Sequence, residues 1–269
     1  MENQSKKYVL ITGATEGIGY ELSKVFAENG FNLVLVARNA SELHYRANEL
    51  RGDYGIEAIP VAKDLFQPGA AFELYDQVRN LGLTIDILVN NAGQGVYGKF
   101  VETDIEKQLY IIQLNIASLT ALTYLFLKDM VARNDGRILN LGSIASEVPH
   151  PLQSVYGGTK AYVLSFSEAL FNELKETNVT VTTLQPGATE TDFFNKAGAQ
   201  NARIVQEGKL GDAAKVARDG YEALMKGRDS VVSGMKNKAM STLAHIVPDK
   251  ASAEQMHKQM KDVTKDKTE

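Results

Sequence analysis

Apolar runs rich in Val, Ile and Leu alternate along the chain with longer stretches in which apolar residues recur at helical spacing. Strands are predicted at Tyr8–Thr12, Phe31–Ala37, Ile56–Ala62, Ile85–Val89, Arg137–Leu141, Val179–Leu184 and Ser230–Val232. Helices are predicted at Ile18–Glu28, Ala40–Arg51, Pro68–Leu81, Ile105–Val131, Tyr156–Glu176 and Asp212–Met225. Nearly continuous apolar strands separated by helices are typical of a parallel sheet covered on both faces. We therefore predict an α/β protein with a doubly wound, mostly parallel, seven-stranded sheet.

No Pro- or Ser-rich linker divides this pattern, so residues 1–249 are expected to form a single domain. The stretch 188–210 is polar and irregular between a strand and a helix, and we expect it to form a lid over a substrate. Residues 250–269 are rich in charges and are expected to form a solvated C-terminal tail.

The composition of the 269 residues, 44% apolar and 23% charged, is that of an ordinary globular protein. A net charge of −4 gives no reason to expect binding to nucleic acid. The chain has no Cys, and its His residues are scattered, so we expect no metal site. These are His44, His150, His245 and His257. We find no secretory signal and no run of about 18 apolar residues, and we expect a cytoplasmic protein without a membrane span.

A glycine-rich turn follows the first predicted strand, in the sequence TGATEGIG. Glycines at such a turn let backbone N–H groups approach a pyrophosphate at the positive end of the next helix. Glycines also simply turn chains, but the position between a strand and a helix favours a dinucleotide site. The candidate cofactor contacts here are Gly13, Thr15, Gly17, Ile18 and Gly19.

Arg38 stands at the end of the second strand, where an NAD site would carry an acidic residue. A guanidinium suits the additional phosphate of NADP(H), so we predict NADP(H) as the cofactor. Asp64, after the third strand, is a candidate to accept from the adenine amino group or to cap the next helix. Asn91, Ala92 and Gly93 follow the fourth strand and form either part of the ligand crevice or a plain turn.

Tyr156 and Lys160 are four residues apart on a predicted helix, so their side chains share a face. A free tyrosine has a pKa of about 10 and is a poor acid at neutral pH. Because a nearby cation favours the phenolate, we expect Lys160 to lower the pKa of Tyr156 and make it a usable proton donor. Ser143 follows the fifth strand and either holds a substrate carbonyl oxygen or is a turn residue.

These motifs occur in an order and at intervals that resemble the short-chain dehydrogenase/reductase family, over about residues 6 to 235. The resemblance, which is to single-domain reductases of 3-oxoacyl and hydroxysteroid type, implies a Rossmann fold. It also implies that Asn115 organises a proton-relay water, that Asn91 lies along the cofactor and that Lys160 touches the nicotinamide ribose. Residues Pro186, Gly187 and Thr191 would then approach the carboxamide.

The expected function is hydride transfer between NADP(H) and a carbonyl or secondary alcohol, with a hydrophobic ketone or 3-oxoacyl compound as substrate. Fold and cofactor alone do not fix the reaction. An epimerase or dehydratase on the same frame, and a non-enzymatic NADP(H) sensor, stay open as alternatives. By analogy with the family, we expect a homodimer or homotetramer formed through the long helices Ile105–Val131 and Ser154–Glu176.

Overall fold

The computed structural model describes residues 7–244 and 247–264. It contains a parallel seven-stranded sheet in the order β3-β2-β1-β4-β5-β6-β7, which confirms the predicted doubly wound fold. The strands are β1 (Tyr8–Thr12), β2 (Asn32–Ala37), β3 (Ala58–Ala62), β4 (Ile85–Asn90), β5 (Gly136–Leu141), β6 (Val179–Gln185) and β7 (Ser230–Val232). Because the chain order reverses between β1 and β4, the carboxyl ends of these two strands form a crevice where such sheets bind ligands.

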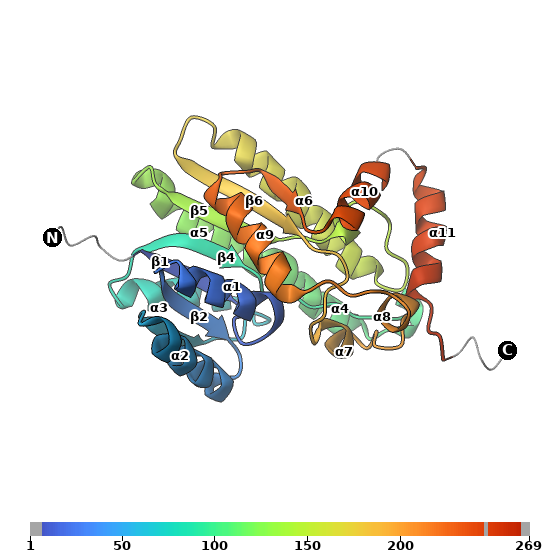
Figure 1. Cartoon of the computed structure of the whole chain (residues 1–269), viewed down its shortest axis with the longest axis horizontal. Helices are drawn as coiled ribbons and strands as arrows, with labels where there is room; N and C mark the ends of the chain where they lie inside the picture. Colours follow the sequence, from blue (N-terminus) through green and yellow to red (C-terminus); the bar gives the residue numbers. More distant parts are fainter. Residues whose placement is uncertain (1–6, 245–246, 265–269) are drawn as a thin grey trace.

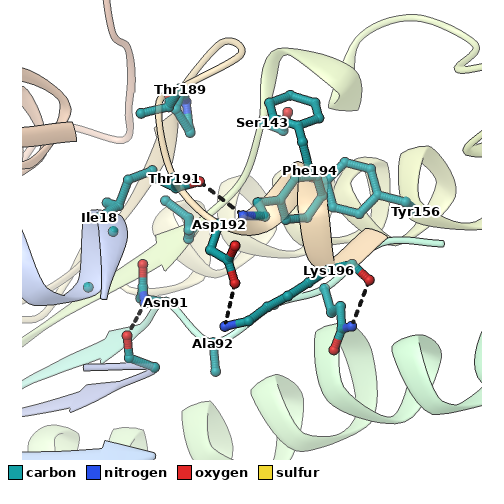
Figure 2. Close-up of a pocket in the computed structure, with 18 of the residues that line it drawn as sticks. Ile18, Asn91, Ala92, Ser143, Tyr156, Thr189, Thr191, Asp192, Phe194 and Lys196 are labelled. Carbon is teal, nitrogen blue, oxygen red and sulfur yellow. Dashed lines mark hydrogen bonds and ion pairs between the residues drawn. The ribbon is translucent and has the colours of Figure 1, made fainter. Parts of the chain in front are cut away.

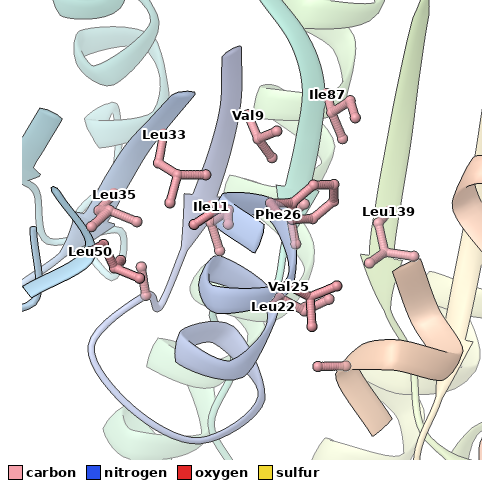
Figure 3. Close-up of a cluster of buried hydrophobic side chains, with 14 of the residues drawn as sticks. Val9, Ile11, Leu22, Val25, Phe26, Leu33, Leu35, Leu50, Ile87 and Leu139 are labelled. Carbon is pink, nitrogen blue, oxygen red and sulfur yellow. The ribbon is translucent and has the colours of Figure 1, made fainter. Parts of the chain in front are cut away.

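Helices cover both faces of the sheet (Figure 1). The longer ones are α1 (Gly17–Glu28), α2 (Ala40–Tyr54), α3 (Ala70–Asn80), α4 (Ile105–Ile112), α5 (Leu119–Ala132), α6 (Ser154–Glu173) and α9 (Ala213–Met225). Short 3-10 turns occur at Phe100–Glu102 and Ile144–Ser146. The side chains of β1 point alternately to the two faces, as the period of a strand requires. Val9 and Ile11 pack against Phe26 of α1 (Figure 3), and Leu10 packs against the cluster around Phe126 of α5.

The prediction of one continuous helix over Ile105–Val131 is wrong in detail. The stretch is divided into α4, a π-helical segment at Gln113–Ser118 and α5. The wider π turn accommodates Ser118, whose hydroxyl donates to the Leu65 carbonyl at 2.7 Å instead of facing solvent. Such single π turns inside α-helices are frequent at functional sites.

The same stretch also overturns the expectation that no segment is long and apolar enough to span a membrane. Ile105–Ala132 contains an 18-residue window with a mean hydropathy of 1.5, of which 44% is buried. Core helices of globular proteins can be equally long and apolar. In this protein the buried face of α5 packs against β4 and β5, and it places Leu122 and Phe126 in the core.

The expected lid, 188–210, contains two short helices, α7 (Phe193–Ala197) and α8 (Arg203–Gln206). Beyond β7 the chain forms α10 (Met235–Ala244), which contacts β7, and then α11 (Asp249–Met260), which lies beside α8 (Figure 1). The prediction of a solvated tail is therefore wrong for α11, because Met256 and Met260 lie one turn apart on a buried face. Residues 265–269 lie outside the described residues.

Candidate active site

The carboxyl ends of β1, β4, β5 and β6 open onto one cavity of about 600 Å³ (Figure 2). Loops that follow these strands supply much of its lining, and the ends of β2 and β3 together with residues of α6, α7, α8 and α11 add to it. The cavity brings together most of the site residues predicted from the sequence. Those in its lining are Gly13, Thr15, Gly17, Ile18, Gly19, Arg38, Asn91, Ala92, Gly93, Ser143, Tyr156, Pro186, Gly187 and Thr191.

The glycine-rich turn is held against the loop after β4 by side-chain hydrogen bonds. The Asn91 side-chain amide donates to the carbonyl oxygens of Thr12, at 2.8 Å, and Gly13, at 3.1 Å. In return, the Thr12 hydroxyl accepts from the backbone N–H groups of Asn91 and Ala92, both at 3.0 Å. Asn91 is thus a buried connector between the two loops that begin at β1 and β4. The cofactor contact expected of it stays a prediction.

The backbone of the turn approaches its neighbours too closely for side chains. Gly13 and Gly17 have φ of 66° and 54°, a left-handed conformation that favours glycine. A Cβ at Gly19 would overlap the carbonyl oxygen of Gly13 and the amide of Asn91. A smooth backbone cradle at the N-terminus of α1 is what a pyrophosphate requires, so these residues fit a bound dinucleotide.

Replacing Gly19 with Ala is therefore expected to weaken NADPH binding by about a hundredfold or more, since the loop must shift to admit the methyl group. Calorimetric titration with NADPH measures this loss. Gly158 on α6 is the matched control, because a Cβ there would meet no atom within 4 Å. Equal affinity in Gly19→Ala and Gly158→Ala would contradict the assigned role of the turn.

Arg38 lies at the far end of the cavity, with its guanidinium carbon 4.8 Å from the centre of the Phe66 ring. This cation–π contact orients the guanidinium without neutralising its charge. Asp64 does not line the cavity. Its carboxylate accepts from the Phe66 N–H at 3.2 Å and from the Gln67 amide at 3.3 Å, so it stabilises the turn before α3. The contact between Asp64 and adenine stays a prediction.

At the opposite end, Ser143, Tyr156 and Lys160 converge from β5 and α6. Lys160 is buried, and its Nζ donates to the Leu141 carbonyl at 2.5 Å and lies 5.8 Å from the centre of the Tyr156 ring. The Ser143 hydroxyl accepts from the Ala145 N–H at 3.1 Å. Figure 2 shows Ser143 and Tyr156 close to Phe194, on the side of the cavity away from Ile18.

Asn115 is buried in the π-helical segment and does not face solvent. Its side-chain amide donates to the Gln94 carbonyl at 2.9 Å and the Thr159 hydroxyl at 3.0 Å, and its carbonyl oxygen accepts from the Gln94 N–H at 3.1 Å. A Cβ at Gly93 would lie 3.4 Å from both Asn115 Oδ1 and Lys160 Nζ, so the two polar groups flank Gly93. The expected proton-relay role of Asn115 stays a prediction.

The pKa values of Tyr156 and Lys160 differ from the sequence-based expectation. Burial raises the pKa of Tyr156 to about 12, and the hydrogen bond with Ser143 only partly opposes this. Burial also lowers the pKa of the Lys160 ammonium to about 8. The expectation that Lys160 lowers the pKa of Tyr156 toward neutrality is therefore wrong here. The low-polarity surroundings disfavour the charged forms of both groups, and Lys160 directs its Nζ at a backbone carbonyl.

The cavity also has lining residues that belong to none of the catalytic or cofactor motifs. Phe193 packs on Tyr156 with the ring centres 5.0 Å apart, and Lys196 forms ion pairs with Glu16 of the glycine-rich turn and with Asp192. Others in the lining are Phe66, Gln94, His150, Gln153, Met256, Gln259 and Met260. No motif marks these positions. The segments Gln94–Phe100, Val148–Ser154 and Phe193–Leu210 were nevertheless expected to line the substrate pocket, and residues of all three do line the cavity. No such signal in the sequence marked Phe66 or the residues of α11.

The described residues 7–244 and 247–264 contain no group of three or more His, Asp or Glu side chains that could hold a metal ion. Among the scattered histidines, His245 lies outside the described residues. His150 lines the cavity near Tyr156, with the ring centres 6.5 Å apart, and burial lowers its pKa to about 4. His150 is therefore neutral at physiological pH.

Comparison with known proteins decides the family. Residues 7–202 match the family model described as short chain dehydrogenase. The chain belongs to the short-chain dehydrogenase/reductase family. Within this family, the chain is 37% identical over 178 residues to a very-long-chain 3-oxoacyl-CoA reductase of Laccaria bicolor. The aligned residues cover 65% of this chain and 52% of that relative. The match therefore spans about half the length of that relative.

Solved structures of short-chain dehydrogenases share the whole fold. One is from Sphingobium yanoikuyae in complex with NADPH, with a TM-score of 0.80 and 29% identity over 90% of this chain and 96% of that one. Another is from Burkholderia phymatum in complex with NAD, with a TM-score of 0.80 and 26% identity over 91% and 95% of the two chains. These two structures of the family thus hold different nicotinamide cofactors, NADPH in one and NAD in the other.

Proposed function

We propose that the protein is an NADP(H)-dependent reductase of carbonyl compounds, acting on a hydrophobic ketone or 3-oxoacyl-type substrate. The observation that carries this proposal is that Tyr156 and Ser143 line one end of a cavity whose other end is formed by the glycine-rich turn and Arg38. Lys160 is buried beside Tyr156 and does not itself line the cavity. A cofactor held by the turn supplies a hydride, and the residues around Tyr156 supply the proton.

The pKa values support Tyr156 as an acid. With a pKa of about 12, its phenol stays protonated at neutral pH and can donate to a carbonyl oxygen. Ser143, which lines the cavity beside the phenol, is suited to hold that oxygen. Lys160, mostly charged below its pKa of about 8, stabilises the negative charge that the phenol acquires as it gives up its proton. Asn115 fixes the loop at Gln94 beside this group.

The preference for NADP(H) rests on Arg38, whose side chain contacts Phe66 and forms no ion pair with a carboxylate in the described part of the chain. Arg38→Gln is expected to lower kcat/KM with NADPH about ten- to a hundredfold, because it would remove a charge-assisted hydrogen bond to the additional phosphate. The value with NADH should stay within about threefold. Steady-state kinetics with each cofactor measure both changes. Arg218→Gln is the control, because Arg218 lies on α9 outside the cavity and its side chain is 59% exposed. An equal loss with both cofactors would contradict the assignment.

The experiment that tests the proposed function is a panel of carbonyl compounds, monitored by NADPH absorbance and run in parallel with NADH. We expect oxidation of NADPH with apolar ketones and little with small polar ones. Failure of every carbonyl compound, with NADPH binding intact, would contradict the proposal.

We also propose that the protein forms a homo-oligomer through α4 and α5. Support comes from apolar side chains that these helices leave exposed, among them Ile105 and Leu109, each 56% exposed, and Tyr124, 59% exposed. Burying such a surface on a second copy is favourable. Sedimentation of the wild type and of Leu109→Lys distinguishes an oligomer from a monomer. The expected cytoplasmic location stays a prediction.

A further inference from the structure

The C-terminal helix α11 is attached to the lid by backbone hydrogen bonds. The Arg203 N–H donates to the Lys261 carbonyl at 2.8 Å, and the Val263 N–H donates to the Asn201 carbonyl at 3.1 Å. The Tyr97 hydroxyl also donates to the Met260 carbonyl at 2.6 Å. Two segments far apart in the sequence, at Tyr97 and at residues 201–203, thus hold the end of α11 in place. Helix α11 itself lies beyond residue 202, where the match to the family model ends.

The buried face of α11 is part of the cavity. Met256 and Met260 are 5% and 1% exposed and line the cavity together with Gln259. Both methionines belong to a cluster that includes Phe193 and Phe194 of α7. The ring of Phe193 lies 5.0 Å from that of Tyr156 and 5.4 Å from that of Phe194. A continuous apolar surface therefore runs from Tyr156 across α7 to the methionines of α11.

We propose that α11 is a specificity-determining wall of the substrate site, and that Met256 and Met260 bind the far end of an apolar arm on the substrate carbonyl compound. This inference rests on the proposed function for the position of the carbonyl, at Tyr156. An alkyl chain or fused ring attached to that carbonyl would follow the aromatic surface to α11. Unbranched, polarisable methionine side chains adapt to such groups, so the wall suits long flexible chains.

The first test uses the wild-type protein and does not depend on turnover. Methionine methyl groups are labelled with carbon-13 and observed by NMR as methyl nonyl ketone is added, with and without NADP⁺. The signals of Met256 and Met260 are expected to shift, whereas that of Met235, which is 87% exposed and outside the cavity, should not. Methyl propyl ketone should shift them far less. Shifts at neither Met256 nor Met260 would overturn the proposal.

The second test is the ratio of kcat/KM for methyl nonyl ketone to that for methyl propyl ketone. Each buried methylene favours binding by about fourfold, so the wild-type ratio should be large. Met256→Gln keeps the length and helix propensity of the side chain but places an amide on the wall, and should lower the ratio about tenfold. Met235→Ala is the control and should leave the ratio unchanged.

The two proposals fail in different ways. If neither ketone is reduced while the signals of Met256 and Met260 still shift, the proposed reaction is wrong, but the binding of an apolar group at α11 is supported. If both ketones are reduced but Met256→Gln keeps the wild-type ratio, the reaction stands and α11 does not determine specificity.

Discussion

Replacing Tyr156 with Phe is expected to lower kcat for ketone reduction roughly a thousandfold, in the range that general acids contribute. The substitution removes only the phenolic oxygen, so the ring keeps its packing on Phe193 and the shape of the cavity is preserved. Because Tyr156 lies at the end of the cavity away from Arg38, the dissociation constant for NADPH should change by no more than a few-fold. Steady-state kinetics and a calorimetric titration with NADPH measure the two quantities.

Tyr110→Phe is the matched control, because Tyr110 lies on α4, is 50% exposed and is outside the cavity. It should leave both kcat and NADPH affinity at the wild-type values. Unchanged turnover in Tyr156→Phe would remove Tyr156 from the mechanism. A large loss of NADPH affinity in that variant would instead indicate a structural role.

Replacing Lys160 with Met is expected to lower kcat about a hundredfold and to weaken NADPH binding, because the side chain would lose both its charge and the cofactor contact implied by the family resemblance. The loss of the Lys160 charge should also change the pH dependence of kcat. The pKa of Lys160 is lowered to about 8, so the cation is present below that pH and is lost as the pH rises through it. Wild-type kcat for reduction should therefore fall above about pH 8, while Tyr156, with its pKa of about 12, stays protonated.

The pH profile separates this role from simple packing. In Lys160→Met the decline above pH 8 should be absent, and the low residual rate should be nearly flat. Lys107→Met, at an exposed position on α4, should keep the wild-type profile. A decline above pH 8 that persists in Lys160→Met would show that another group titrates.

The sequence was sufficient to predict the fold because each layer carries a local signal. Neighbouring strand positions such as Leu33 and Val34 point to opposite faces of the sheet and are both apolar, and the turn after β1 carries the glycines that the backbone there requires. The same holds for the residues at the strand ends, since the carboxyl ends of parallel strands meet at one edge of a sheet. The order of the motifs along the chain therefore suffices to place Gly13, Asn91 and Ser143 at one crevice.

Other features depend on tertiary contacts that no local pattern encodes. The π turn at Asn115 contains no Gly or Pro and forms with buried polar bonds to Gln94 and Thr159. The charged residues of 250–269 gave no sign that Met256 and Met260 are buried, because their burial depends on distant segments, among them α7, α8 and the loops at Tyr97 and Leu152. The pKa of Tyr156 could not be predicted from its spacing to Lys160, because the surrounding protein disfavours both charges.

Transfer of deuterium tests the central claim most directly. The protein is given NADPH that carries deuterium at the transferable position of the nicotinamide, together with methyl nonyl ketone, and the alcohol is analysed by mass spectrometry. We expect an alcohol with a single deuterium on its carbinol carbon from the wild type and almost no product from Tyr156→Phe. An alcohol without deuterium, or no alcohol from any ketone while NADPH binds, would contradict the proposed hydride transfer.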